Sequence, residues 1–331
     1  MDGHGKLDDP DTSQGWYAVV LSWNGREDTL DCLASLRDAM AESNVICVDN
    51  GSTDGSQAAV RTHFPNMHLI EAGQNLGYAG GNNLGIRRAV ELGATWVVLV
   101  NNDATVAPDV IGGFQSAAAL SPRAGILAGK VYFADRPSKI WFAGQRVSLL
   151  TGYSGRPRGY GREDAARYQR VERTGRAVGA LMAVSREAIE LVGLFDEALF
   201  AYVEDVDWAL RVRAAGLDVV FAPDARAWHR VSASTGGESR STHTFYYGAR
   251  NTVVVLERHR PLPLPGTIAR RVAILCTFLL HALIKPNRGA AIRATADGFR
   301  DALRGRMGVR PEPDTALVGH RQGDAPTEGL S

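Results

Sequence analysis

Cysteine is scarce in this chain of 331 residues, which contains only Cys32, Cys47 and Cys276 and no C-x-x-C pair. Three widely spaced cysteines argue against both a disulfide framework and a cysteine zinc site, and they fit a reducing cytoplasm. An excess of charge is missing too, because the formal net charge is +1 at pH 7. A nearly neutral chain has no general attraction to polyanions, so nucleic acid is not an expected partner.

The N-terminus lacks the hydrophobic segment of a secretory signal. Residues 1–15 are polar and acidic, whereas such a signal begins with basic residues and continues into an apolar run. We therefore predict a disordered tail at 1–15 and a cytoplasmic location. The phosphate-binding motif G-x-x-x-x-G-K-[ST] is also absent, which removes support for ATP hydrolysis.

The chain does contain an alternation of strand-like and helix-like segments. Short apolar runs typical of buried strands lie at 17–23, 45–49, 68–72 and 96–100. Helical segments are predicted between them, at 26–42, 57–62 and 82–92. This alternation predicts an α/β fold with a mostly parallel sheet flanked by helices. In such sheets ligands bind beyond the carboxyl ends of the strands.

The second half of the chain is less regular. Residues 152–176 are rich in Gly, Arg and Tyr and show little periodicity, and we interpret them as a mobile loop. A helix is predicted from Glu204 to Ala215, because Gly216 follows as a typical helix terminator. A further strand is predicted at 219–223.

Polar loops follow the predicted strands. Asp49 begins the loop DNGSTDGS, where a carboxylate at the end of a buried strand can bond the base or ribose of a nucleoside. A simple turn is the competing interpretation, since Asp, Asn, Gly and Ser are turn formers. The loop QNLGYAGGNNLG at 74–85 brings glycines and amide donors to a helix start, which favours anions. It lacks the G-x-G-x-x-G spacing of dinucleotide sites.

The fourth strand is followed by Asn101, Asn102 and Asp103. Oxygen ligands of this kind suit a hard divalent cation that bridges two phosphates, so Asp103 is the predicted metal ligand. A turn without a metal is the alternative. His229 could complete such a site through a ring nitrogen, and a purely structural histidine is the equal alternative.

Three carboxylates crowd the first turn of the helix predicted at 204, namely those of Glu204, Asp205 and Asp207. Acids at a helix start complement the helix dipole, which is sufficient explanation for an ordinary helix. Here Tyr202 precedes the acids and Trp208 follows them. Carboxylates beside aromatic rings suit a sugar-binding cleft in which one acid removes a hydroxyl proton. We therefore expect Tyr202, Asp207 and Trp208 on the acceptor side.

Six motifs in this order resemble those of the family-two glycosyltransferases with the GT-A fold: VVLSWNG, VDNGSTDGS, NLGYAGGNN, VLVNNDA, VGALMAVSR and FAYVEDVDWALR. The nearest subgroup is that of bacterial rhamnosyltransferase-like and galactofuranosyltransferase-like enzymes, which implies a role in cell-surface polysaccharide synthesis. The resemblance implies a catalytic domain at 16–260, with a nucleotide-sugar-binding half at 16–104 and an acceptor-binding half at 105–260.

The resemblance also assigns roles to single residues. The donor-binding residues would be Ser22, Asn24, Asp49, Asp54, Asn75, Gly80, Asn82, Asn101 and Asn102. Asp103 would match the last acid of the family's D-x-D metal motif, which departs from its pattern here because Asn101 stands in place of the first acid. Asp205 would be the catalytic base, with Glu204 positioning it or the acceptor. His229 would match a metal-binding histidine found in part of the family.

The implied activity is an inverting transfer of a sugar from a nucleoside diphosphate to a hydroxyl of a glycan, glycolipid or small molecule. UDP- or dTDP-sugars are the expected donors, with dTDP-rhamnose among them. Mg²⁺ or Mn²⁺ on the diphosphate would stabilise the leaving group while Asp205 takes the acceptor proton. Two other classes compete. A sugar-nucleotide pyrophosphorylase would need a better phosphate loop than SWNGRED, and a non-catalytic carbohydrate-binding protein would not need Asp103 together with Asp205.

The composition changes after residue 260, and we predict a helical appendage at 261–310 and a disordered tail at 311–331. The apolar segment 272–284 has thirteen residues, fewer than the ~20 that span a bilayer. Basic residues flank it, namely Arg270, Arg271, Lys285, Arg288 and Arg293. One interpretation is a helix on the inner face of the membrane, where the acceptor would be a lipid-linked glycan. The other is a contact within the protein or a homodimer.

Overall fold

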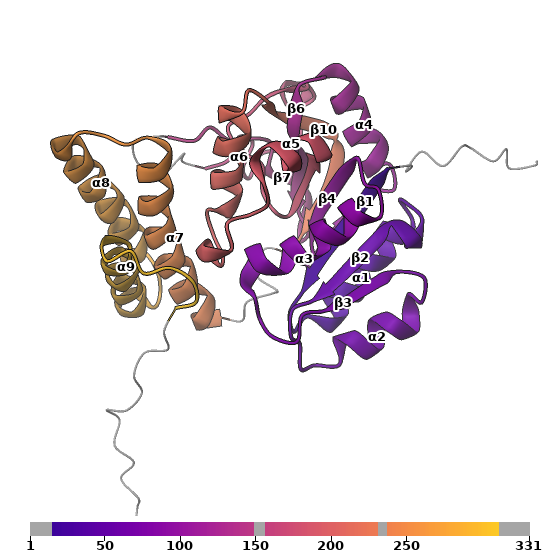
Figure 1. The fold of residues 1–331 in the computed structure, drawn as a ribbon, viewed down its shortest axis with the longest axis horizontal. Coiled ribbons are helices and arrows are strands. Elements are labelled where there is room, and N and C mark those ends of the chain that lie inside the picture. Colours follow the sequence, from indigo (N-terminus) through magenta and orange to yellow (C-terminus); the bar gives the residue numbers. More distant parts are fainter. Residues whose placement is uncertain (1–14, 149–155, 231–236, 311–331) are drawn as a thin grey trace, which may run out of the picture.

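The computed structural model describes residues 15–148, 156–230 and 237–310, with side chains from residue 242 onward in the last range. A central sheet flanked by helices forms one part, and three C-terminal helices form a layer beside it (Figure 1). The tails predicted at 1–15 and 311–331 lie outside the described residues, apart from Gly15.

The N-terminal half alternates strands and helices, as the apolar runs predict. The strands are β1 (Trp16–Ser22), β2 (Val45–Asp49), β3 (His68–Glu71) and β4 (Trp96–Asn101). The helices are α1 (Arg26–Arg37), α2 (Ser56–His63) and α3 (Gly77–Glu91), and a short 3-10 turn, η1 (Glu42–Asn44), precedes β2. The four strands are parallel neighbours in the order β3-β2-β1-β4. Helix α3 begins at Gly77, five residues before the predicted start.

The second half turns the parallel sheet into a mixed one. Its strands are β5 (Ala104–Val106), β6 (Ala124–Phe133), β7 (Arg136–Phe142), β8 (Glu172–Arg173), β9 (Leu181–Ser185) and β10 (Asp218–His229). Strand β9 pairs antiparallel with both β4 and β6, and the order continues β4-β9-β6-β10-β5. The expectation of a mostly parallel sheet therefore holds for β1–β4, and in the second half only β6 and β10 pair in parallel. Strand β10 reaches His229 itself, well beyond the predicted end at 223.

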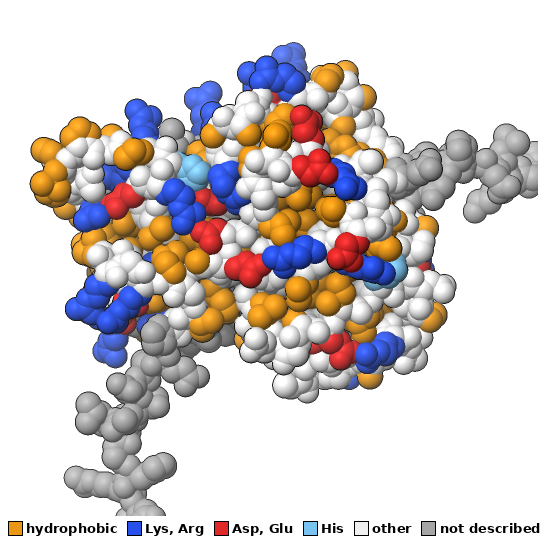
Figure 2. All heavy atoms as spheres, viewed as in Figure 1, with side chains coloured by type: hydrophobic (Ala, Val, Ile, Leu, Met, Phe, Trp, Pro, Cys, Tyr) orange, Lys and Arg blue, Asp and Glu red, His pale blue; other side chains and the backbone are white. Residues whose placement is uncertain are grey.

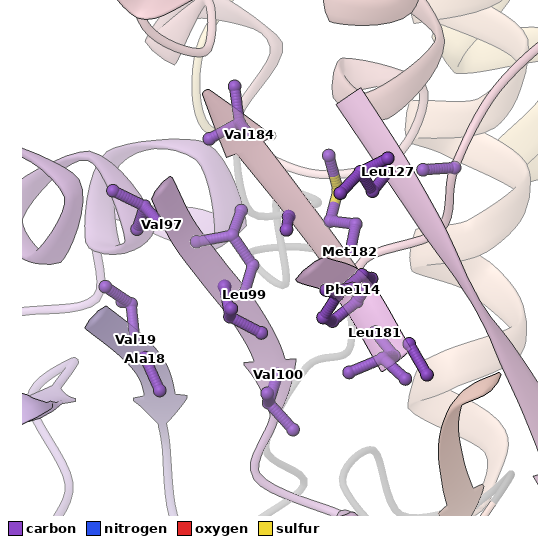
Figure 3. Packing of buried hydrophobic residues seen from close by; sticks show 14 of the residues in the cluster. Ala18, Val19, Val97, Leu99, Val100, Phe114, Leu127, Leu181, Met182 and Val184 are labelled. Carbon is purple, nitrogen blue, oxygen red and sulfur yellow. The ribbon is translucent and has the colours of Figure 1, made fainter. Parts of the chain in front are cut away.

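Helices and turns of the second half complete the layers. They are α4 (Val110–Leu120), η2 (Ala166–Tyr168), α5 (Arg186–Val192), η3 (Glu197–Leu199) and α6 (Glu204–Ala214). Apolar side chains of β1, β4, β6, β9 and α4 fill the main core (Figure 3). Val19, Leu99 and Phe114 are each fully buried there. Burial of this kind fixes the strand register, and the register aligns Ser22 with Asp49 and Leu21 with Asn101.

The segment interpreted as a mobile loop is anchored over most of its length. Residues 152–155 lie outside the described part of the chain, but the remainder contains η2 and β8. The ammonium group of Lys130, buried on β6, lies 2.9 Å from Asp164 Oδ2 and donates to Gln169 at 3.0 Å. A buried charge needs such partners, so these contacts hold 156–176 against the sheet.

The C-terminal layer consists of α7 (Gly237–His259), α8 (Leu264–Leu283) and α9 (Arg288–Leu303). Helix α8 has 20 residues and begins eight residues before the apolar segment 272–284. Pro265 lies in its first turn, where proline is tolerated because the N–H groups there have no intrahelical partner. Among the described residues, α8 alone is long and apolar enough to cross a membrane by length and composition.

Helix α8 packs on α7 and α9 through one face only. Arg270 and Ile274 are buried on that face. The opposite face exposes residues at a spacing of four, namely Leu264, Ile268, Val272, Cys276 and Leu280. Apolar atoms gather over the outer part of α8 in Figure 2.

Candidate active site

The loop after β2 surrounds the carboxylate of Asp49. Its Oδ2 atom accepts hydrogen bonds from the N–H groups of Gly51 and Ser52 and from the side-chain amide of Gln57, at 3.2, 3.0 and 2.7 Å. Its Oδ1 atom is buried and has no hydrogen-bond partner among the described residues. A buried oxygen without a partner destabilises the fold. A hydroxyl or N–H donor of a bound nucleoside would satisfy it.

Asn24 and Asp54 join the loops that follow β1 and β2. Asn24 Oδ1 accepts from the N–H of Thr53 at 2.8 Å, and its φ of 49° is a left-handed conformation that asparagine tolerates. Asp54 Oδ2 accepts from the N–H of Arg26 at the start of α1, at 3.0 Å. The two loops therefore form one continuous surface at the carboxyl end of the sheet.

Ser22 and Asn102 meet at Thr29 of α1. Thr29 Oγ1 lies 2.8 Å from Ser22 Oγ and accepts from the Asn102 amide at 3.1 Å. All three side chains are buried. Asn101 lies beside them on β4 and accepts a weak bond from Cys32 Sγ through its backbone carbonyl, at 3.5 Å. This network fixes the ends of β1 and β4 behind the site.

Asn50 links the loop after β2 to the start of α3, a role that the sequence analysis missed. Its amide donates to Asn75 Oδ1 at 3.1 Å and to Gly77 O at 3.2 Å, and its own Oδ1 accepts from the N–H of Leu76 at 2.9 Å. A single asparagine in a polar loop does not indicate, from sequence alone, that it forms hydrogen bonds to a second loop. Gly80 and Asn82 are buried in α3, where the Asn82 amide donates to Tyr78 O at 2.9 Å.

Asp103, in the turn between β4 and β5, and His229, at the end of β10, come together. His229 Nε2 lies 2.9 Å from Asp103 Oδ1, and both residues are buried. Trp141 packs edge-on against the imidazole at 5.1 Å. The other ring nitrogen, Nδ1, is buried without a hydrogen-bond partner among the described residues. A cavity of about 330 Å³ opens beside Asp103 and is also lined by Asp28, Asp31, Trp228 and Arg230.

This pair fits a divalent cation. Carboxylate oxygen and imidazole nitrogen are suitable ligands, and Mg²⁺ and related ions are commonly held by one or two protein groups plus substrate phosphates. No group of three or more His, Cys, Asp or Glu side chains with metal-binding geometry occurs in the described part of the chain. A cation here would therefore need oxygens from the donor diphosphate.

Tyr78, in the first turn of α3, contacts the second half of the chain. Its hydroxyl lies against Gly179, where an added Cβ would come within 1.9 Å of it. Burial raises the pKa of Tyr78 well above its usual value, and the negative charges of Glu204, Asp205 and Asp103 raise it further. The charges of the predicted metal ligand and of the predicted base thus both raise the pKa of Tyr78.

Glu204 and Asp205 begin α6 side by side and are buried. Desolvation, together with the charge of Asp205, raises the pKa of Glu204 to about 8. Arg176 Nη1 lies 3.3 Å from both oxygens of Asp205. Glu204 Oε2 has no hydrogen-bond partner among the described residues. The pair combines a protonated acid with a carboxylate stabilised by a cation, a combination typical of acid-base sites.

The turn before Glu204 is strained. Phe200, Tyr202 and Val203 have φ values of 64°, 65° and 74°. Ala201 N donates to Leu199 O at 2.8 Å, which makes a γ-turn around Phe200 with the rare positive φ. Non-glycine residues in such conformations cost on the order of 1–3 kcal/mol each and cluster at functional sites.

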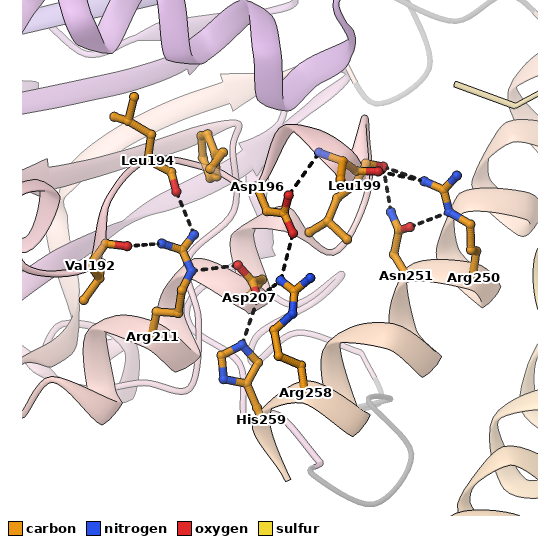
Figure 4. Close-up of polar contacts among 12 residues, drawn as sticks. Val192, Leu194, Asp196, Leu199, Asp207, Arg211, Arg250, Asn251, Arg258 and His259 are labelled. Carbon is orange, nitrogen blue, oxygen red and sulfur yellow. Dashed lines mark hydrogen bonds and ion pairs between the residues drawn. The ribbon is translucent and has the colours of Figure 1, made fainter. Parts of the chain in front are cut away.

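Asp207 and Trp208 do not face an acceptor, which corrects the prediction. Both are fully buried. Asp207 pairs with Arg211 at 2.8 Å and with His259 of α7 at 2.8 Å (Figure 4). Trp208 Nε1 donates to Gly193 O at 2.9 Å. Because Asp205 and Asp207 lie two positions apart on a helix, they point in different directions. Tyr202 is partly exposed and accepts from Thr244 Oγ1 at 3.0 Å.

The arrangement matches a known class of protein. A mannosyltransferase from Pyrobaculum calidifontis, solved in complex with GDP-Man and Mn²⁺, is similar over 92% of this chain and 92% of its own, with a TM-score of 0.52 and 20% identity. The fold is that of the GT-A glycosyltransferases.

The family follows from the sequence comparisons. The family model described as glycosyl transferase family 2 matches residues 17–192. The N-acetylglucosaminyl-diphospho-decaprenol L-rhamnosyltransferase of Mycobacterium tuberculosis is 31% identical over 74% of this chain and 86% of its own. The dTDP-rhamnosyl transferase RfbF of Shigella flexneri is 26% identical over 86% of this chain and 95% of its own. The chain belongs to glycosyl transferase family 2 and is a glycosyltransferase.

Proposed function

We propose that this glycosyltransferase transfers rhamnose from dTDP-rhamnose to a hydroxyl of a lipid-linked glycan, with inversion at the anomeric carbon. The observation that carries the proposal is that the Asp103–His229 pair and the neighbouring acids Glu204 and Asp205 are all buried, because transfer needs a group for the diphosphate and a base for the acceptor. Two relatives are named as rhamnosyltransferases, and one is named for a decaprenol-linked substrate. Those names favour this donor and this acceptor class over UDP-sugars and small molecules.

The chain's own residues would bind the donor at its two ends. Asp49 Oδ1 would accept a hydrogen bond from the nucleoside, and the surface formed by Asn24, Asp54 and Asn75 would surround it. Asp103 and His229 would hold Mg²⁺ or Mn²⁺. When bound, the cation would neutralise charge that develops on the leaving diphosphate.

Asp205 would take the proton of the acceptor hydroxyl. The acceptor oxygen then forms its bond to the anomeric carbon while the bond from that carbon to the diphosphate oxygen breaks. A single displacement inverts the centre. Arg176 would orient Asp205 at 3.3 Å, and Glu204, protonated below about pH 8, would donate a hydrogen bond to the acceptor or to Asp205.

The proposal extends to where the enzyme works. The exposed face of α8 is apolar from Leu264 to Leu280, and the exposed cations Lys285, Arg288 and Arg293 follow it. The other two flanking cations are engaged inside the layer: Arg270 donates to the carbonyls of Leu256 and Arg260, and Arg271 pairs with Glu257. An apolar face with cations at one end suits the anionic inner leaflet, where a lipid-linked acceptor would lie.

Donor screening tests the activity. Thermal stability is measured with dTDP-rhamnose, UDP-glucose and GDP-mannose, each with and without Mn²⁺, because a ligand of the folded state raises its apparent stability. We expect the largest rise with dTDP-rhamnose and Mn²⁺, and transfer to a polyprenyl-diphosphate-N-acetylglucosamine acceptor with an inverted linkage by NMR. A larger rise with either other donor, or a retained configuration, would refute the proposal.

A further inference from the structure

Two buried side chains of α7 donate hydrogen bonds to the strained turn that precedes Glu204. Asn251 Nδ2 lies within hydrogen-bond distance of three carbonyls of the turn, those of Leu199, Ala201 and Tyr202, at 2.9, 2.9 and 2.7 Å. An amide group has two hydrogens, so the carbonyls share them. Three converging carbonyls repel one another unless a donor lies between them, and Asn251 supplies that donor.

Arg250 sets the orientation of this amide. Its Nε donates to Asn251 Oδ1 at 2.9 Å, which directs the NH₂ group towards the turn (Figure 4). Its Nη2 donates to Leu199 O at 3.0 Å, and its Nη1 donates to Gly308 O at 2.6 Å. The guanidinium also lies 5.0 Å from the centre of the Tyr247 ring. Arg250 and Asn251 are both fully buried, so water does not compete for these bonds.

The donor side of the molecule holds the same turn from the opposite direction. Phe200 O accepts from the N–H of Ala79 at 3.1 Å, within α3. A Cβ on Gly77 would come within 2.4 Å of that same carbonyl, so the approach requires glycine. The Phe200 ring stacks on Tyr247 at 5.2 Å. The turn is therefore fixed between the donor loop and α7.

We propose that Asn251 and Arg250 are positioning residues that hold the Leu199–Val203 turn in its strained form and thereby direct Asp205 at the acceptor. The inference rests on the proposed function, because that function assigns the base to Asp205. It predicts that the C-terminal helical layer contributes to turnover through this turn.

The test compares Asn251→Asp with Val253→Ala. Asn251→Asp keeps the shape of the side chain but replaces the N–H donor with an oxygen that faces the carbonyls. Val253 is also fully buried on α7 but packs against Leu256 and Ile274 of the helical layer, so its truncation is a matched control for general loosening. Arg250→Lys keeps the charge but loses the hydrogen bond that orients Asn251. This variant takes the place of Asn251→Asp in the comparison if Asn251→Asp does not fold.

Three quantities are measured for each variant. Calorimetric titration with dTDP counts the folded binding sites. The transfer rate from dTDP-rhamnose is then divided by that count to give a rate per site. Hydrogen exchange is followed at the backbone amides of residues 198–206. For Asn251→Asp we expect exchange at least about tenfold faster at the turn and a rate per site about a hundredfold lower, the usual effect of a small misplacement. A merely structural role lowers the site count and leaves the rate per site unchanged.

The outcomes distinguish a positioning role of Asn251 from a merely structural one, and they test the proposed donor separately. Val253→Ala should keep both the wild-type rate per site and the wild-type exchange at the turn. A wild-type rate per site in Asn251→Asp despite faster exchange would overturn the positioning role, and so would unchanged exchange at the turn. If the wild-type enzyme transfers nothing from dTDP-rhamnose, the proposed donor fails, and the same comparison with whichever donor stabilises the enzyme decides the positioning role.

Discussion

Glu204 is a buried carboxyl with a pKa of about 8, compared with 4.5 for an ordinary glutamate. The unfolded chain therefore binds fewer protons than the folded one between these two values. This group's contribution to stability is fully present below about pH 4.5 and is lost as the pH rises through about 8.

Glu204→Gln removes this titration. We measure the free energy of unfolding with urea between about pH 5 and pH 8. We expect it to change less in this variant than in the wild type, and the two changes should differ by up to a few kcal/mol. Equal pH dependence in the two proteins would show that Glu204 is ionised throughout.

Asp205→Asn tests the base. The amide keeps the size of the side chain but cannot accept the acceptor proton, so we expect turnover to fall by about two to four orders of magnitude with dTDP binding retained. Asp218→Asn, on β10, is the control and should be active. Near-normal turnover of Asp205→Asn would exclude the role.

Asp103→Ala tests the cation site. We expect EDTA to abolish transfer by the wild type, Mn²⁺ or Mg²⁺ to restore it, and neither ion to rescue the variant, because an uncharged methyl group cannot ligate a hard cation. Asp38→Ala, at the exposed end of α1, should respond as the wild type does. Full activity in EDTA would contradict the assignment.

Residues at strand ends were the ones that sequence patterns could predict. Asp49 and Asp103 follow apolar runs, so their place at the carboxyl edge of the sheet follows from the strands themselves. Asn50, Thr29 and Tyr78 could not be predicted, because their roles depend on contacts between loops. Trp208 was misplaced, since an aromatic residue beside acids has the same pattern in a core as in a cleft.

Among elements, the start of α3 has no room for a single methyl group at Gly77. Gly77 and Gly55 both have positive φ, 74° and 82°, but a Cβ at Gly55 would meet nothing within 4 Å. Gly55→Ala should therefore cost only the conformational strain, about 1–2 kcal/mol.

Gly77→Ala should cost more, because its Cβ would also collide with the Phe200 carbonyl. We expect an additional loss of about 1–3 kcal/mol and lower activity, measured by thermal unfolding and transfer assays. Equal losses in the two variants would show that the contact between α3 and the turn is loose.

Elements with strong periodicity were predictable, and those set by distant pairing were not. The first four strands and α6 follow from their own residues. Strand β9 is antiparallel because of its position between β4 and β6, which no local pattern records. The start of α8 at Leu264 was not predicted because it lies outside the apolar segment 272–284, and Pro265 fits there because the first turn of a helix accepts proline.

At the scale of the whole molecule, the outward face of α8 determines the proposed membrane contact. We expect the enzyme to bind vesicles that contain anionic lipid at low salt and to be released as salt rises. Leu280→Lys, at 65% exposed, should weaken this binding in a sedimentation assay. Leu191→Lys changes a leucine that is 58% exposed on α5 and should not. Equal binding by both variants would place the contact elsewhere.

The bond between Arg250 and the Gly308 carbonyl has a consequence for synthesis in the cell. Gly308 also donates its N–H to Ala198 O at 2.8 Å, so a residue near the end of the chain completes the support of the turn beside Asp205. On the ribosome, this residue emerges only after the whole sheet has been translated. If Arg250 positions the turn as proposed, we expect full turnover only once translation has passed Gly308.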